Sequence, residues 1–180
     1  MRLFTKRFGR YTAVFEPEEA TLVSDLVDQV RQMLAGRRAE SSADPLAKVT
    51  GMAMAPSTPP ADLAMARLLP DFHASDTELA AGLRMLHEPD LIARKDACAV
   101  ALLDTLPRGG GTVRLDSAAA QSWVSTLNDV RLALGVRLNI TDDDYELPPD
   151  TDPDGAQTAI FATYRWLSAV QDSLVTALLN

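Results

Sequence analysis

Residues 112–138 read TVRLDSAAAQSWVSTLNDVRLALGVRL, and this stretch decides the fold class. Its first four residues, 112–115, are mostly β-branched or apolar and predict a short strand. Asp116 follows as a typical N-cap, because its carboxylate can accept hydrogen bonds from the unpaired N–H groups of a first helical turn. Apolar residues then recur at helical spacing, at Trp123, Leu127, Val130 and Leu134. We therefore expect a strand followed directly by a helix that ends near Gly135.

The partner of this strand is predicted at the N-terminus, in residues 2–15. Residues 3–8 and 11–15 are short runs of aromatic and β-branched side chains, joined by Gly9-Arg10. Glycine accepts positive φ, so this pair suits a two-residue type II′ turn. Because an isolated strand needs partners, we expect the hairpin and residues 112–115 to form one small antiparallel sheet.

The other regular segments carry helical signals. A first helix opens with Glu16-Pro17-Glu18-Glu19, where proline fits the first turn and the acids favour its positive end, and Gly36 is its predicted terminator. Further helices are expected over residues 62–69, 76–87, 88–106 and about 153–179. Pro70 stops the first of these and Pro107 the third, whereas Asp76 starts the second and Asp152-Pro153 the last. The stripes predicted to face the core are Leu22, Val23, Leu26, Val30, Met33 and Leu34 in the first helix and Ile160, Tyr164, Leu167, Val170, Leu174 and Leu178 in the last.

Two segments lack these signals. Residues 37–60 begin with a polar run and hold three prolines within 55–60, so we predict a mobile connection there. Residues 141–154 form an acidic loop with seven carboxylates and no cation. At 180 residues the chain fits one domain, residues 1–180. The expected fold is mainly α: a bundle of about six helices with a small antiparallel β sheet.

The composition restricts the function classes. The net charge of −8 disfavours general nucleic-acid binding, unless a local basic patch overrides it. Lys6, Arg7 and Arg10 interrupt the apolar residues of the N-terminus, which argues against a signal peptide. No stretch approaches the roughly 18 consecutive apolar residues of a membrane span. A single cysteine excludes an intramolecular disulfide and suits a reducing compartment, so we expect a cytoplasmic protein.

Signals for metal, nucleotide or catalytic sites are incomplete. Residues 150–155 copy the first half of an EF-hand loop, but the twelfth position, which should be a bidentate glutamate, is Phe161. The glycines at 109–111 lack the lysine of a phosphate-binding loop. His73 and His87 belong to no metal-ligand cluster or catalytic motif. The sequence therefore predicts no metal, no cofactor and no enzyme, although a catalytic site assembled from distant residues stays an alternative.

The lone cysteine has two interpretations. Cys98 shares a helical face with Leu91 and Leu102, so it fits a buried thiol that packs as a small hydrophobic residue. If Cys98 is partly exposed, Arg94 and Lys95 would lower its thiol pKa and make it redox-sensitive.

The N-terminal hairpin concentrates positive charge beside aromatic rings. Its cations and rings are Arg2, Lys6, Arg7, Arg10, Phe4, Phe8 and Tyr11. Three interpretations remain open: a solvated edge that prevents sheet aggregation, a docking surface for an acidic protein, or a DNA-binding wing.

Three segments together resemble a known family: LLPD at 68–71, WVSTLNDVRLALGVRL at 123–138 and YRWLSAVQDSL at 164–174. In their order they are similar to the AosR-like family of actinobacterial oxidative-stress regulators, long catalogued as a domain of unknown function. The resemblance covers nearly the whole chain, and its middle segment is the most specific. It implies a cytoplasmic transcriptional regulator that contacts a stress sigma factor under redox control. A disulfide switch would need two cysteines, and this chain has only Cys98.

Polar residues beside the apolar stripes supply further candidate contacts. Asn128, Asp129 and Arg131 lie largely off the stripe of their helix, Arg137 follows just beyond it, and Arg165 and Trp166 flank the stripe of the last helix. These residues either bond to neighbouring helices and loops or form a recognition face, since tryptophan and arginine are frequent interface anchors.

The leading hypothesis is a non-enzymatic regulator of stress transcription that binds a sigma factor or another part of the transcription machinery. Its candidate partner-binding residues are Arg7, Arg10, Asn128, Asp129, Arg131, Arg137, Arg165 and Trp166, with Cys98 as the candidate redox residue. Direct DNA binding through the basic hairpin is the first alternative. Uncovered apolar faces on the last helix also favour a homodimer.

Overall fold

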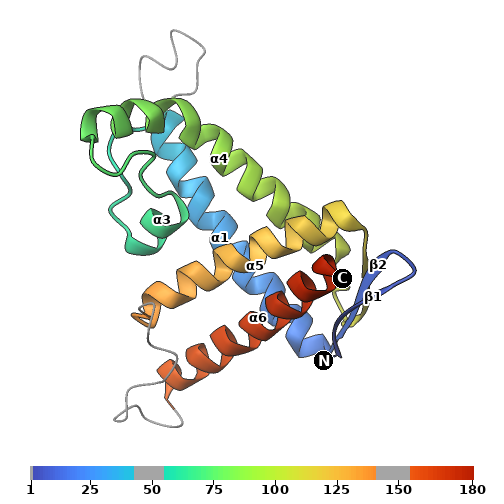
Figure 1. Cartoon of the computed structure of the whole chain (residues 1–180). Helices are drawn as coiled ribbons and strands as arrows, with labels where there is room; N and C mark the ends of the chain where they lie inside the picture. The colour runs from blue at the N-terminus through green and yellow to red at the C-terminus, as the bar shows by residue number, and fades with distance from the viewer. Residues whose placement is uncertain (1, 43–54, 141–154) are drawn as a thin grey trace.

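One helix, α5 (Ser117–Arg137), lies at the centre of the fold and contacts nearly every other element. The computed structural model describes residues 2–42, 55–140 and 155–180. The other elements are β1 (Arg2–Arg7), β2 (Arg10–Phe15), α1 (Pro17–Ser42), α3 (Leu63–Leu68), α4 (Thr77–Thr105), β3 (Gly111–Leu115) and α6 (Ala156–Leu179). Figure 1 shows α5 between α6 on one side and α1 and α4 on the other, with the strands at one end. The expected fold class is confirmed.

The three strands form the predicted antiparallel sheet, in the order β1-β2-β3. Along β2 the side chains of Tyr11, Ala13 and Phe15 are buried, and β3 adds Val113 and Leu115 to the same inner face. This alternation is what period-two side-chain packing produces when one face covers a core. The edge strand β1 is tied to α6, because the Phe4 N–H donates to Ser173 Oγ at 3.2 Å.

The hairpin turn differs from the prediction by one residue. Arg7 pairs directly with Arg10, so the two turn residues are Phe8 and Gly9 rather than Gly9-Arg10. Both turn residues have positive φ, 49° for Phe8 and 72° for Gly9. Positive φ at both positions marks a type I′ turn, whose twist matches that of the strands, so the type II′ assignment was wrong.

Helix α1 continues through its predicted terminator. It runs past Gly36 to Ser42, so residues 37–42 are helical and not part of a mobile connection. The core stripe is centred on Val27, while Leu22, predicted to face the core, is exposed. Of the rest of that connection, residues 43–54 lie outside the described chain. Residues 55–60 are anchored at Ala55, which is buried.

The two helices predicted on either side of Pro89 are one continuous helix, α4. Proline inside a helix lacks the N–H that would bond the carbonyl four residues earlier, here that of Met85. The Met85 oxygen instead accepts a hydrogen bond from Ala55 N–H at 3.1 Å. A distant segment therefore satisfies the carbonyl that Pro89 leaves free, and the helix passes through without a break.

The C-terminus of α5 is set by Asn139 and not by Gly135. Asn139 has a left-handed φ of 52°. Its N–H donates to Val136 O, and the Ile140 N–H donates to Gly135 O, at 3.1 and 2.9 Å. These two bonds make a Schellman motif, in which asparagine can replace glycine. Helix α6 begins at Ala156, after Gly155 as N-cap. The predicted Asp152-Pro153 start and the acidic loop at 141–154 lie outside the described residues.

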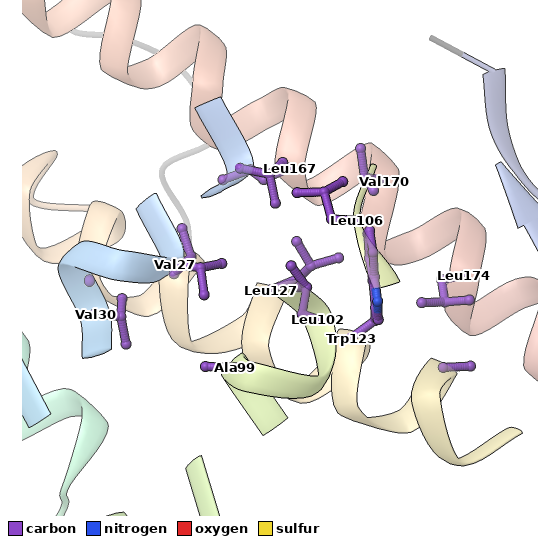
Figure 2. Close-up of a cluster of buried hydrophobic side chains, with 14 of the residues drawn as sticks. Val27, Val30, Ala99, Leu102, Leu106, Trp123, Leu127, Leu167, Val170 and Leu174 are labelled. Atoms are coloured by element: carbon purple, nitrogen blue, oxygen red, sulfur yellow. The ribbon is translucent and has the colours of Figure 1, made fainter. Parts of the chain in front are cut away.

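The core forms where four helices meet (Figure 2). Its labelled side chains are Val27, Val30, Ala99, Leu102, Leu106, Trp123, Leu127, Leu167, Val170 and Leu174. Trp123 is fully buried, donates from Nε1 to Thr105 Oγ1 at 2.7 Å, and meets the rings of Phe4 and Phe15 at 5.5 and 5.7 Å. Trp123 thereby joins the sheet to the helices. Within the residues described, none of the helices combines the length and apolar character needed to cross a bilayer.

Candidate functional site: the cationic sheet face

The sheet is the most positive part of an acidic molecule. Its three strands carry the cations Arg2, Lys6, Arg7, Arg10 and Arg114, and no strand residue is a carboxylate. The whole chain has a net charge of −8. Charge is therefore segregated, and a cationic patch of this kind attracts anionic surfaces.

The strand register places four arginines on the outer face of the sheet. Side chains that pair across strands share a face. Arg7 pairs with Arg10, Thr12 pairs with Arg114, and Arg2 pairs with Val14. Residues 10, 12 and 14 alternate with the buried side chains of β2, so all their partners face outward. We call the outer-face residues Arg2, Arg7, Arg10 and Arg114 the cationic sheet face.

The cationic sheet face is largely unneutralised. Arg10 lies 3.7 Å from the carboxylate of Asp116, and both side chains are about 60% exposed (59% and 60%). An exposed pair of this length contributes little stability. Among the described residues, Arg2, Arg7 and Arg114 have no carboxylate within ion-pair distance. Lys6 lies on the other face, with its ammonium 5.8 Å from the Tyr11 ring.

Asp129, a predicted partner-binding residue, is not on the surface. Only 3% of it is exposed, and its Oδ1 lies 2.5 Å from Lys95 Nζ on α4. Burial raises the pKa of the Asp129 carboxyl by more than the Lys95 ammonium lowers it. Asp129 therefore links α5 to α4, while its neighbour Asn128 is exposed.

Arg131 links α5 to α6 and is only partly accessible. Its Nη1 donates to Gln171 Oε1 at 2.5 Å, and its guanidinium lies 5.4 Å from the Tyr164 ring centre. Gln171 in turn donates to the carbonyl of Val124 at 3.3 Å. This arrangement matches the structural interpretation of Arg131, in which it bonds to a neighbouring helix.

The remaining predicted contacts are dispersed. Arg137 is exposed at the end of α5 that lies farthest from the sheet in Figure 1. Arg165 is exposed on α6, and Trp166 is half-buried with its ring edge-on to Phe15 at 6.4 Å. Among the predicted residues, Arg7 and Arg10 are direct cross-strand partners and lie together on one exposed face of the sheet. Arg114, which the sequence reasoning missed, joins them, and its alternation with Val113 and Leu115 was the available signal.

Cys98 is half-buried on α4. Lys95, one turn away, directs its ammonium to Asp129, and Arg94 is exposed. Lys95 is therefore paired with Asp129 and not with the thiol. The redox role of Cys98 stays a prediction.

The histidines are peripheral in the described structure. His73 Nδ1 accepts from the Asp76 N–H at 3.0 Å, beside the N-terminus of α4. The His87 ring lies 6.0 Å from that of Phe72. Among the described residues, no three His, Cys, Asp or Glu side chains are grouped to hold a metal ion. The half EF-hand at 150–155 lies almost entirely outside those residues.

A buried ionic cluster was also missed. Glu88 is fully buried and binds two buried arginines, Arg37 through Oε1 at 2.7 Å and Arg84 through Oε2. Arg84 and Glu88 continue the spacing of Ala80 and Ile92 along α4. Charged residues on an apolar stripe were therefore the signal that could have found this cluster.

Comparisons with known proteins show the family of this chain. A family model described as a domain of unknown function, DUF2017, matches residues 1–178. The putative oxidative stress regulator AosR of Mycobacterium leprae is 35% identical over 192 residues, which cover 99% of this chain and 87% of that protein. The oxidative stress regulators AosR of Mycobacterium bovis and Mycobacterium tuberculosis show the same identity and coverage. No solved structure matches. The chain therefore belongs to the DUF2017 family and is a relative of these AosR proteins.

Proposed function

We propose that this protein regulates the transcriptional response to oxidative stress by binding another protein, a stress sigma factor or another part of the transcription machinery. The names of its relatives support the regulatory role. The observation that carries the binding mode is the cationic sheet face, which presents four outward arginines on a chain of net charge −8. Such a face steers an acidic partner and fixes its orientation.

A protein partner fits this face better than duplex DNA does. Asp116, directly after β3, places a carboxylate 3.7 Å from Arg10. DNA-binding surfaces neutralise several successive phosphates, and a duplex lying across Arg10 would meet this carboxylate. A compact protein surface can contact the arginines and avoid Asp116.

The experiment measures binding of the purified chain to stress sigma factors and to core RNA polymerase by biolayer interferometry. The test variant is Arg7→Glu with Arg10→Glu. The control is Arg67→Glu with Arg94→Glu, which makes the same charge change at exposed helical positions. We expect the test variant to bind at least about tenfold more weakly and the control to bind as the wild type does. No binding by the wild type, or equal losses in both variants, would contradict the proposal.

A second measurement distinguishes direct DNA binding from binding to a protein partner. Titration of a fluorescent duplex at about 150 mM salt should give no saturable binding. If the duplex binds with a steep salt dependence that the Arg7/Arg10 reversal removes, the DNA-binding alternative is correct.

Redox control and self-association are tested in the same system. Since Cys98 is the only cysteine, oxidation can join it only to another molecule. A peroxide effect on binding that Cys98→Ser abolishes would support a redox role for this thiol. Light scattering of the purified chain decides whether it is a monomer or a homodimer.

A further inference from the structure

We propose that the hairpin tip is the anchor of the docking surface: Phe8 inserts into an apolar pocket of a partner protein, and Arg7 and Arg10 bind carboxylates at the rim of that pocket. This inference rests on the proposed function for the identity of the partner, but not for the chemistry of the contact.

The backbone at the tip departs from local preference. Phe8 has a φ of 49°, a conformation that asparagine, aspartate and glycine adopt readily and that is an outlier for a bulky aromatic residue. It occupies the first central position of a type I′ turn, where Asn-Gly is the favoured pair. Phenylalanine at this position makes the hairpin harder to form. Such a local violation is expected at functional sites.

The Phe8 side chain makes no packing contact that would offset this unfavourable backbone conformation. Phe8 is 104% exposed, so its ring contacts no other part of the described protein. The other exposed large hydrophobic side chains of the described residues are aliphatic, and the most exposed of them is Leu179, at the end of the chain, at 83%. Aromatic side chains that project alone and on a rigid support are typical binding anchors.

The charges that flank Phe8 are also arranged unfavourably within the protein itself. Arg7 and Arg10 are direct cross-strand partners, and like charges in that position repel. The carboxylate of Asp116, 3.7 Å from Arg10, compensates only one of them and only through solvent-exposed side chains. An anionic rim supplied by a partner would neutralise both arginines. The tip therefore combines an apolar anchor with two cations around it.

The hairpin below the tip is held firmly. Strand β2 is paired on both sides, and β1 is fixed to α6 through Phe4, which is buried and bonded to Ser173. Lys6 covers the ring of Tyr11 just beneath the turn. A preorganised support reduces the ordering cost of association, which favours insertion into a pocket.

The decisive variant is Phe8→Asn. Asparagine suits the left-handed conformation before Gly9, so the variant should fold with an unchanged or higher melting temperature. Loss of an anchor of this kind should weaken binding about 30-fold or more in the interferometry assay. The control is Leu86→Gln, which removes an exposed apolar side chain (62%) from α4 and should leave binding unchanged. Wild-type affinity in Phe8→Asn would overturn the proposal.

Photocrosslinking separates this inference from the proposed function. A benzophenone analogue of phenylalanine is placed at position 8, and in a second sample at position 86, in cells that naturally make the protein. The adduct sites are identified by mass spectrometry. An adduct specific to position 8, on apolar residues bordered by aspartate or glutamate of a sigma factor or polymerase subunit, supports both proposals. Such an adduct on any other protein supports the tip and refutes the proposed partner. An adduct with nucleic acid, or none beyond that at position 86, overturns the tip proposal, whatever the sigma-factor assay shows.

Discussion

Two carboxylates bind the guanidinium of Arg37 at the same distance, and they provide a matched test of buried charge. Glu88 accepts from Arg37 Nε at 2.7 Å and is fully buried, whereas Glu40 accepts from Nη1 at 2.7 Å and is 60% exposed. Changing either residue to glutamine removes one negative charge with almost no change in volume. Glu88 also binds Arg84, so the difference between Glu88→Gln and Glu40→Gln reports on burial together with this second buried ion pair.

We expect Glu88→Gln to lower the free energy of unfolding by about 3 kcal/mol. Removing one partner from a buried ion pair costs about 3–5 kcal/mol, because the remaining charge is left uncompensated. We expect the lower end of this range, because both arginines retain another acceptor. Arg37 still donates to the Thr58 carbonyl and Arg84 to the Asp71 carboxylate, each at 2.6 Å. For a chain of this size the loss corresponds to a fall in melting temperature of about 6–12 °C. Glu40→Gln should cost at most about 1 kcal/mol, as exposed pairs do.

Urea unfolding followed by circular dichroism measures both variants. The midpoint for Glu88→Gln should fall with an unchanged m-value, which shows a change in stability rather than in compactness. Equal midpoints for Glu88→Gln and Glu40→Gln would refute the reasoning, because burial would then make no difference.

Three further predictions test other parts of the fold. Gly110→Ala should unfold far more easily than Gly109→Ala in thermal melts, because a Cβ at Gly110 would lie 2.7 Å from Pro17 N at a φ of 72°, whereas a Cβ at Gly109 meets open space; similar melting temperatures would contradict this. Pro89→Ala should raise the unfolding free energy by about 1 kcal/mol in urea titrations, less than the roughly 3 kcal/mol of an ordinary helix interior, because Met85 O already has a donor; a loss of stability would contradict it. Burial raises the pKa of Asp129, so its contribution to stability is greatest below its unfolded pKa and is lost as pH rises through the folded value; the stability of the wild type relative to Asp129→Asn, measured between about pH 3 and 8, should therefore fall as pH rises, and a flat or rising difference would disprove the assignment.

Local sequence rules predicted two helix starts. Asp76 and Asp116, the predicted N-caps, each accept a hydrogen bond from the N–H three residues later, at 2.9 Å in both cases. Asp62, which was predicted only as the first residue of a helix, is itself the N-cap of α3 and accepts from the Met65 N–H at 2.7 Å. The pairing of residues 112–115 with the hairpin was also predictable, because a lone strand needs partners. These features depend only on neighbours in the chain or on a single unpaired edge.

Contacts between distant residues explain what the sequence did not predict. Asp129 was a candidate surface residue because it lies off the main apolar stripe of α5. In the fold it meets Lys95, which lies 34 positions earlier, and no helical periodicity encodes that pairing. Of the four arginines on the cationic sheet face, the sequence predicted Arg7 and Arg10 as partner-binding residues. Placing Arg114 beside them required the register of β2 with β3.

Gly36 and Pro89 were both predicted at a helix boundary, yet each lies inside a helix, and both are adjacent to the Arg37–Glu88 ion pair. Gly36 precedes Arg37 in α1, Pro89 follows Glu88 in α4, and Arg37 and Glu88 are bonded to each other. The buried ion pair thus holds both helices in register where their local preference is weakest. Helix α1 begins directly after β2, and its other end, which carries Arg37, lies away from the sheet in Figure 1. If stability and recognition are separated in this way, Glu88→Gln should lower the melting temperature but leave partner affinity unchanged below that temperature. The Arg7/Arg10 reversal should lower partner affinity but leave the melting temperature unchanged. A variant at either end that changed both properties would show that the two ends are coupled.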